Sequence, residues 1–148
     1  MSTLNSTSLY EKDFYAWTQE QAKLIKDKAL IKLDLNHLYE ELNIMGAKEK
    51  SELKNRLAQL LMHLLKWKYQ SIRQSRSWKN TIEDQREELE DLLKDNPSLK
   101  NKINECFERS YKKAIRRAIE ETGLDESVFP QFCEWTIEQI LDNEFYPN

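Results

Sequence analysis

Residues that interrupt helices are scarce in this chain, which has only two glycines and three prolines among 148 residues. Both residue types disfavour helix interiors, so their scarcity favours long, uninterrupted helices. Cysteine is equally rare: Cys106 and Cys133 fit neither a zinc-binding spacing nor a disulfide framework. The chain is long enough to bury a hydrophobic core without such cross-links. We expect both cysteines to be reduced, as in the cytoplasm.

Long hydrophobic runs are also lacking. The longest apolar stretch, residues 60–65, is interrupted by His63 and is far shorter than the roughly 20 residues needed to span a membrane. Residues 1–8 are uncharged and rich in polar side chains, without the basic start and apolar segment of a signal peptide. We therefore expect a soluble cytoplasmic protein with no membrane partner.

Hydrophobic residues recur at helical spacing, and no segment alternates with a period of two for long enough to predict a strand. We predict helices over about 9–29, 35–70, 77–94 and 97–122, followed by a short helix after Thr136. Residue types that favour helix ends stand at Ser8-Leu-Tyr-Glu11, Asp34, Ser77, Asn96-Pro97, Gly123 and Thr136-Ile-Glu-Gln139.

Short connections between these helices imply antiparallel neighbours. The predicted fold class is all-α: an antiparallel bundle of four main helices, one of them long, with a short C-terminal helix, in one domain over residues 1–148. Gly46 and the polar block Lys48-Glu-Lys-Ser-Glu52 mark where the long helix bends most readily. A coiled-coil dimer through this helix is the alternative, although the polar block interrupts its hydrophobic seam.

Basic charge is concentrated in one segment. Residues 66–79 hold five basic residues, no acid and three aromatics, whereas the chain as a whole has a net charge of −3. Arginine side chains bind phosphate groups, and tryptophan rings stack on nucleobases. The segment could therefore bind an anion or a nucleic-acid backbone. The competing interpretation is that these bases pair with acids of the next helix, such as Glu83 and Glu87. A pI near 5.6 argues against a nucleic-acid-binding surface, which usually has a dominant basic face.

Two histidines are candidate functional groups. His63 lies in the most apolar turn and needs a hydrogen-bond partner for its ring, or a carboxylate if it performs acid–base chemistry. His37 could share a helical face with Glu40 and Glu41, but the chain has no Glu-x-x-His motif of the kind that binds di-iron centres. We expect a solvated face there, no metal and no cofactor. The basic stretch 112–117 is expected to be a solvated face as well.

One candidate ligand-binding set follows from this reasoning, with Gln85 as the lone polar residue of an apolar stripe. Its members are His63, Arg73, Arg76, Trp78, Gln85, Arg86 and Glu41. Four of them, Glu41, His63, Gln85 and Arg86, could form a buried polar cluster that either fixes helix register or binds a ligand. No catalytic residue can be assigned, and whether the protein is an enzyme stays open.

An ordered series of short motifs resembles the bacterial family of domain of unknown function 29. The motifs are Tyr10-Glu-Lys-Asp-Phe-Tyr-Ala-Trp17, His63-Leu-Leu-Lys-Trp67, Arg76-Ser-Trp78, Thr81-Ile82, Gln85-Arg86, Pro97-Ser-Leu99, Glu121-Thr-Gly-Leu124, Phe129-Pro130 and Phe145-Tyr-Pro147. Glu134 departs from the pattern, because relatives often have proline there. The resemblance implies a helical, cytoplasmic bacterial protein and no activity.

Two functions remain. The first is a helical protein–protein interaction module that binds an unknown protein partner or a second copy of itself. The alternative is a small-ligand or phosphate/nucleic-acid binding site, possibly hydrolytic, around His63, Arg73, Arg76 and Gln85. A concave polar pocket over those side chains would favour the second, and an apolar patch away from them would favour the first.

Overall fold

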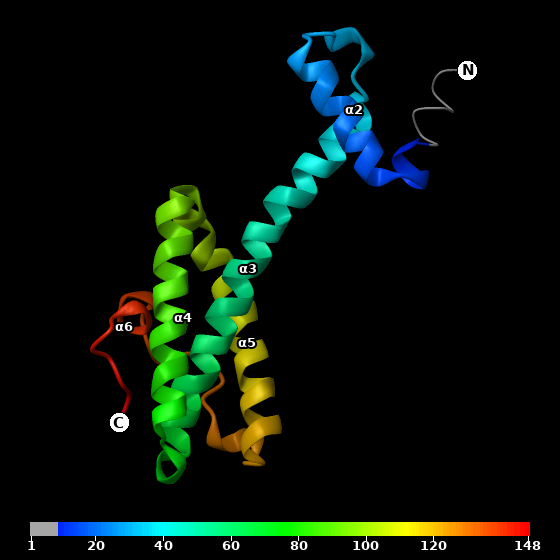
Figure 1. Cartoon of the computed structure of the whole chain (residues 1–148). Coiled ribbons are helices and arrows are strands. Elements are labelled where there is room, and N and C mark those ends of the chain that lie inside the picture. Colours follow the sequence, from blue (N-terminus) through cyan, green and yellow to red (C-terminus); the bar gives the residue numbers. More distant parts are fainter. Residues whose placement is uncertain (1–8) are drawn as a thin grey trace. The chain divides into compact units, whose positions relative to one another are not determined.

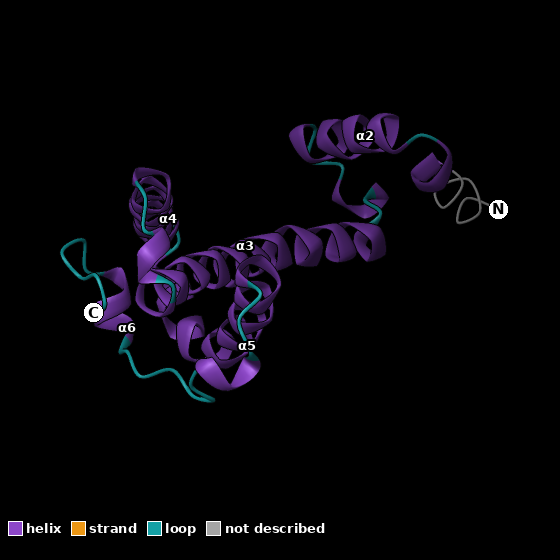
Figure 2. Cartoon of the chain, turned by 90° about the horizontal axis from the view of Figure 1, so that it is seen from below, coloured by secondary structure: helices purple, strands orange, loops and turns teal. Residues whose placement is uncertain are grey.

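The structure, a computed structural model, describes residues 9–148, which form helices and no strand (Figures 1 and 2). Four helices exceed ten residues: α2 (Phe14–Lys26), α3 (Leu35–Tyr69), α4 (Arg76–Asp95) and α5 (Ile103–Thr122). A short helix, α6 (Ile137–Leu141), lies near the C-terminus. Four 3₁₀ turns cover Leu30–Lys32, Ser71–Arg73, Pro97–Lys102 and Glu126–Val128. The predicted all-α class with one long helix is confirmed.

The chain divides into two compact units, with the boundary between Ala47 and Lys48. The first part of α3 belongs to the N-terminal unit and the remainder belongs to the C-terminal unit. Two compact units can still unfold together, so the expectation of a single cooperative domain over residues 1–148 stays a prediction.

The start of the N-terminal unit differs from the predicted helix over residues 9–29. Residues 9–12 are helical, the helix is interrupted at Asp13, and α2 then begins at Phe14. The Asp13 carboxylate accepts a hydrogen bond from the backbone N–H of Ala16 at 3.0 Å, so it caps α2 and separates it from the preceding turn. Ser8 of the proposed first capping box lies outside the described residues.

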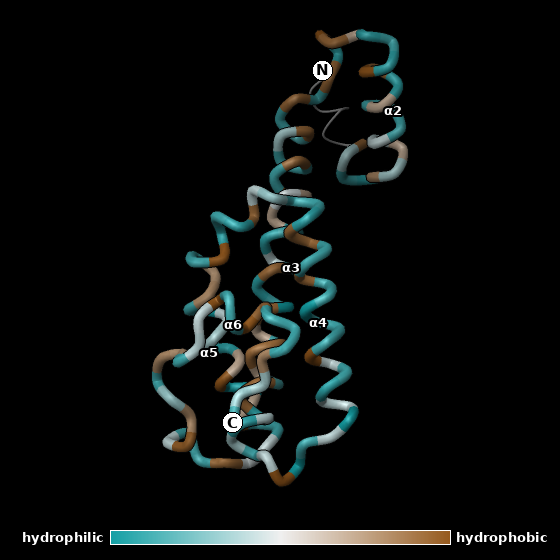
Figure 3. Tube along the Cα trace, turned by 90° about the vertical axis from the view of Figure 1, so that its left-hand side faces the viewer, coloured by the Kyte–Doolittle hydropathy of each residue, from teal (hydrophilic) through white to brown (hydrophobic). Residues whose placement is uncertain are grey.

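Asp34 connects α2 to the start of α3. The backbone N–H of His37 and the Nδ1 atom of its ring lie 3.4 and 2.7 Å from the two Asp34 carboxylate oxygens, as expected for the predicted cap. The indole N–H of Trp17, a residue only 2% exposed, donates to the same carboxylate at 3.0 Å. Figure 3 shows the hydrophobic positions that recur along α2 and α3.

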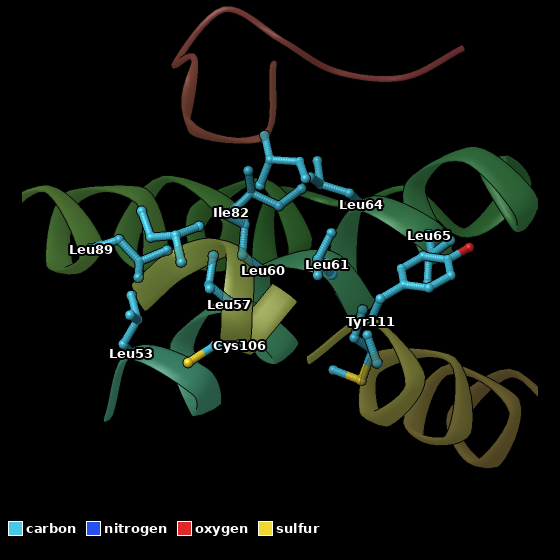
Figure 4. Packing of buried hydrophobic residues seen from close by; sticks show 14 of the residues in the cluster. Leu53, Leu57, Leu60, Leu61, Leu64, Leu65, Ile82, Leu89, Cys106 and Tyr111 are labelled. Atoms are coloured by element: carbon cyan, nitrogen blue, oxygen red, sulfur yellow. The ribbon is translucent and has the colours of Figure 1, made fainter. Parts of the chain in front are cut away.

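The hydrophobic core of the C-terminal unit is built around the second part of α3. Leu53, Leu57, Leu60 and Leu64 are at most 1% exposed and pack against side chains of α4 and α5 (Figure 4). From Leu53 onward the leucine seam of α3 is buried in this core, so it is not available to a second chain. A coiled-coil dimer along the whole helix does not fit this packing.

The C-terminal tail covers the core with aromatic side chains. Phe129 is 6% exposed, and Trp135 and Phe145 are half-buried with ring centroids 6.0 Å apart. Phe132 is 70% exposed and does not belong to this cover. The Tyr111 hydroxyl donates to the carbonyl of Pro130 at 2.7 Å, which fastens the start of the tail to α5.

Two predicted helix starts are shifted. The α4 cap is Ser75 rather than Ser77, because the extended backbone at Ser75 lets its hydroxyl accept from the N–H of Trp78 at 3.2 Å. Pro97 begins the 3₁₀ turn Pro97–Lys102, and α5 starts only at Ile103. The single helix predicted over 97–122 is therefore a 3₁₀ turn followed by α5.

The predicted caps at the other end of the chain are confirmed. Gly123 ends α5 in the left-handed conformation with φ of 71°, which glycine adopts without steric strain. Thr136 and Gln139 form the reciprocal capping box of α6.

Gly46 does not interrupt α3, which runs as one element from Leu35 to Tyr69. Apart from the adjacent backbone of α3 itself, a methyl group built at Gly46 would meet no atom of the described residues within 4 Å. Among the described helices, none is long and apolar enough to cross a membrane.

Candidate functional site

His63 is a core residue of α3, 7% exposed, and its ring is held by the helix itself. Its Nδ1 atom lies 3.0 Å from the carbonyl oxygen of Gln59, one turn earlier, so Nδ1–H donates to that carbonyl. Burial lowers the pKa of His63, which favours the neutral ring. In the part of the chain that the structure describes, no carboxylate contacts the ring. The ring of His63 therefore has its hydrogen-bond partner within its own helix.

Gln85 and Glu41 do not join His63. The Gln85 side-chain oxygen accepts from an Nη atom of Arg56 at 3.3 Å, on the contact between α3 and α4. Glu41 belongs to the N-terminal unit, where its carboxylate accepts a hydrogen bond from the hydroxyl of Tyr10. That bond raises the pKa of Tyr10 to about 12. The three polar groups of the proposed cluster therefore have three separate sets of partners.

Arg86 is the most deeply buried charged residue of the described chain, at 2% exposure. Its Nε donates to the carbonyl of Ile140 at 2.8 Å, and its Nη2 donates to the carbonyl of Phe145 at 2.7 Å. The guanidinium carbon also lies 5.3 Å from the ring centroid of Tyr146. Arg86 thus fastens α4 to the C-terminal tail.

Arg73 and Arg76 are exposed, and neither forms an ion pair with any residue between 9 and 148. The expected pairing of these bases with Glu83 and Glu87 is thus not present. Arg76 lines a hollow of about 470 Å³ together with Trp67, Lys79 and Glu83. The hollow that contains Gln85 has other lining residues, so the predicted residues form no common pocket.

Trp78 lies beside the buried end of the basic segment. The Lys66 ammonium is 4.6 Å from the centroid of the indole ring and 2.9 Å from the carboxylate of Glu121 on α5. Lys66 is 6% exposed, whereas Trp78 is half-buried. Lys68 pairs similarly with Glu134 of the tail at 3.1 Å. These two lysines connect α3 to α5 and the tail, so part of the basic segment is structural.

His37 occupies an aromatic cluster rather than a solvated face. Its ring stacks on Tyr10 with centroids 3.8 Å apart, while Nδ1 contacts Asp34. Burial acts to raise the pKa of Asp34, but hydrogen bonds from His37 and Trp17 outweigh it, so the pKa falls below its usual range. Within residues 9–148, no three His, Cys, Asp or Glu side chains are placed to hold a metal.

A group of basic residues outside the predicted set gathers between α3 and α5. Arg109, Lys113 and Arg116 of α5 line one hollow with Lys54 of α3. The residues of α5 recur at intervals of three or four, which places them on one helix face and is visible in the sequence. Their neighbour from α3 is 55 residues away from Arg109 in the chain, so the sequence alone could not have placed it there.

Comparison with known proteins gives one match. The family model described as Domain of unknown function DUF29 matches residues 9–146. No curated protein matches the chain. No solved structure matches it.

Proposed function

The chain belongs to the family of Domain of unknown function DUF29, and we propose that it acts as a helical protein–protein interaction module. Its binding surface is the apolar surface of the N-terminal unit, and the partner is a second copy of the chain. The proposal includes a bacterial cytoplasmic setting, which accords with two free cysteines.

The observation that supports the proposal is the uneven distribution of exposed hydrophobic side chains. Thirteen large hydrophobic residues of the described chain are exposed, and ten of them belong to the N-terminal unit. These ten are Phe14, Tyr15, Ile25, Leu30, Ile31, Leu35, Tyr39, Leu42, Ile44 and Met45. Isolated exposed hydrophobics are normal, but such a concentration in fewer than 40 residues is typical of an interaction surface.

The first part of α3 carries a stripe with a defined spacing. Leu35, Leu42 and Met45 are 66%, 65% and 61% exposed, and half-buried Leu38 lies between them. The intervals of three, four and three residues match the alternating spacing by which helices pack knobs into holes. We define these four residues as the α3 stripe.

A second copy is a suitable occupant because the α3 stripe is complementary to itself. Two helices with the same three–four spacing can pair about a two-fold axis, the commonest symmetry of homo-oligomers. Charge does not oppose this pairing strongly, since residues 1–47 hold five lysines and seven acids, a net charge of −2. A partner selected by charge would require a stronger field.

The magnitudes predict a weak dimer. Full burial of one such side chain contributes about 2 kcal/mol, so the three exposed residues of two stripes contribute roughly 8 kcal/mol at the observed exposures. Association opposes this with at least about 4 kcal/mol of lost translational and rotational freedom. Flanking residues such as Tyr39 and Ile44 must add contacts for a dissociation constant near 1 µM, which needs about 8 kcal/mol net.

Sedimentation velocity of the full chain over a range of about 0.1 to 200 µM tests the proposal, because this range brackets the expected constant. The variant Leu35→Gln/Leu42→Gln removes two exposed stripe residues without touching a core. Its matched control is Ile72→Gln/Phe132→Gln, which removes two residues that are 93% and 70% exposed in the other unit.

We expect a dimer for the wild type and the control, and a monomer for the stripe variant. A wild-type chain that stays monomeric throughout the range would overturn the proposal. So would a dimer that only the control disrupts, because the interface would then lie on the C-terminal unit.

The alternative function, a ligand site around His63, Arg73, Arg76 and Gln85, has less support. The His63 ring is buried and bonded to its own helix, and the other three residues line no common hollow. A ligand could reach Arg73 and Arg76 at the surface, but it would not meet His63 there in the geometry observed.

A further inference from the structure

A hollow of about 410 Å³ lies between α3 and α5 and is lined only by residues with polar or charged side chains. The lining residues are Ser51, Lys54, Asn55, Arg109, Ser110, Lys112, Lys113 and Arg116. Its floor is fixed by Ser110, which is 1% exposed and donates its hydroxyl to the carbonyl of Lys54 at 3.0 Å. Because this bond joins the two helices, the bases on either side of it are held near one another.

Five of the eight lining residues are basic and none is acidic. Since the chain has a net charge of −3, the residues outside this hollow carry a net charge of −8. The only ion pair among the five joins Lys112 to Glu108, with the charged atoms 3.7 Å apart. In the described structure, the other four bases have no carboxylate within ion-pair distance, and Lys113 instead donates to the side-chain oxygen of Asn55 at 2.8 Å.

The positive charges in the hollow repel one another. Burial lowers the pKa of Lys113 first, and the positive charges of Arg117, Arg116 and Lys54 lower it further. The positive charge in this hollow is therefore only partly compensated within the chain. An anion bound there would relieve the repulsion among these groups.

We propose that this hollow binds a chain of phosphate groups, such as an inorganic polyphosphate or the phosphate chain of a nucleotide. Arg109 and Arg116 are seven residues apart, which is about 10 Å along the helix axis. One orthophosphate meets both guanidinium groups only if the two side chains bend toward each other, whereas several linked phosphates can contact both in extended conformations. Guanidinium groups bind phosphate oxygens in pairs, and the ammonium groups of Lys54 and Lys113 supply further charge.

The lining also indicates what the hollow does not recognise. It holds no aromatic or aliphatic side chain on which a nucleobase could stack. Proteins that bind single-stranded nucleic acid combine a basic groove with such stacking platforms. The phosphates themselves are therefore the recognised group, and any base or sugar attached to them remains in solvent.

Isothermal titration calorimetry of the full chain with inorganic tripolyphosphate at low ionic strength tests the proposal. We expect saturable binding of one tripolyphosphate per hollow, weakened by added salt because exposed charges are screened. Orthophosphate should bind at least about tenfold more weakly, since it lacks the second set of charge-assisted contacts. A parallel titration with ATP tests the sources: affinity comparable with that of tripolyphosphate shows that the hollow accepts the phosphate chain of a nucleotide as well, whereas exclusion of ATP leaves an inorganic chain as the ligand.

The variant Arg109→Gln/Arg116→Gln should weaken tripolyphosphate binding by about a hundredfold, at roughly tenfold for each arginine. Its control is Arg73→Gln/Arg76→Gln, which lowers the net charge by the same two units in the predicted basic segment and should bind like the wild type. Both pairs are exposed, so circular dichroism should show that both variants fold.

Three results would overturn the inference. The first is no heat of binding with the wild type at about 1 mM tripolyphosphate, a very weak affinity by any standard. The second is an equal loss of affinity in both double variants, which would indicate non-specific attraction. The third is tight binding of single-stranded RNA that tripolyphosphate does not compete with. None of these results bears on dimerisation through the α3 stripe.

Discussion

Replacing Arg86 with methionine should destabilise the C-terminal unit and release its tail. Arg86 supplies the hydrogen-bond donors for the carbonyls of Ile140 and Phe145, at 2.8 and 2.7 Å, from a position that is 2% exposed. Methionine fills a similar volume but donates nothing, so both carbonyls lose their charged donor. Hydrogen bonds to charged groups contribute about 1.5–3 kcal/mol each, which gives a gross loss of roughly 3–6 kcal/mol.

An opposing effect reduces this loss. A buried guanidinium loses hydration, and the Nη1 atom of Arg86 is buried without a partner in the described structure. Methionine removes that penalty and also removes the contact with Tyr146, which contributes about 1 kcal/mol. We expect a net destabilisation of about 2–4 kcal/mol, because the tail's carbonyls cannot find new donors in the core.

The assay is thermal unfolding followed by circular dichroism, together with limited proteolysis. A loss of about 3 kcal/mol lowers the Tm by roughly 10 °C in a protein of this size. Cleavage within residues 137–148 should accelerate at temperatures where the core is still folded. Arg76→Met, an exposed position on the same helix, is the control and should change stability by less than about 0.5 kcal/mol. An Arg86→Met variant as stable as the wild type would refute the reasoning, since desolvation would then outweigh both bonds.

Two further perturbations follow from the structure. Because burial lowers the pKa of His63, the free energy of unfolding should be highest above the unfolded-state pKa near 6.5 and should fall as the pH drops below it. Urea unfolding at pH 7.5 and 5.5 should therefore show a larger loss of stability for the wild type than for His63→Gln. Equal losses in the two proteins would contradict the prediction. Gly46→Ala should stabilise α3 by about 0.5–1 kcal/mol, since a methyl group there meets no atom of the described residues within 4 Å apart from the adjacent backbone of α3, and a lower urea midpoint would show that the helix is not continuous at this position.

The sequence predicted the helices well because hydrophobic spacing and capping chemistry are local. Gly123 and Thr136 have the side chains that a helix end requires, and both occupy the expected places. Errors arose where two adjacent segments offered competing caps. Ser75 and Ser77 are both good cap residues, and the choice between them depends on the preceding turn at 71–73. Asp13 was missed as a cap because the hydrophobic spacing continues through it.

The candidate residues do not form one cluster, because they were chosen by residue type and not by partner. His63, Gln85 and Arg86 are polar residues within apolar stripes, and each was expected to meet the others. Each instead bonds to something that the sequence does not reveal: a carbonyl of its own helix, Arg56 and the tail. Backbone carbonyls are common partners of buried polar side chains, and no residue pattern marks them.

The basic hollow between α3 and α5 was not predicted from the sequence, because its members also come from different helices. The sequence spacing of the α5 bases is that of an ordinary solvated helix face, formed by Arg109, Lys113 and Arg116. Acids such as Glu108 also lie nearby in the sequence. The structure adds Lys54 of α3 to these bases, because the hydrogen bond from Ser110 to the Lys54 carbonyl holds the two helices together. The bases therefore line a common hollow. A local excess of one charge sign depends on which helices pack together, so it is determined by the fold and cannot be read from the sequence. In a chain with net charge −3, such a local excess becomes visible only once the packing of α3 on α5 is known.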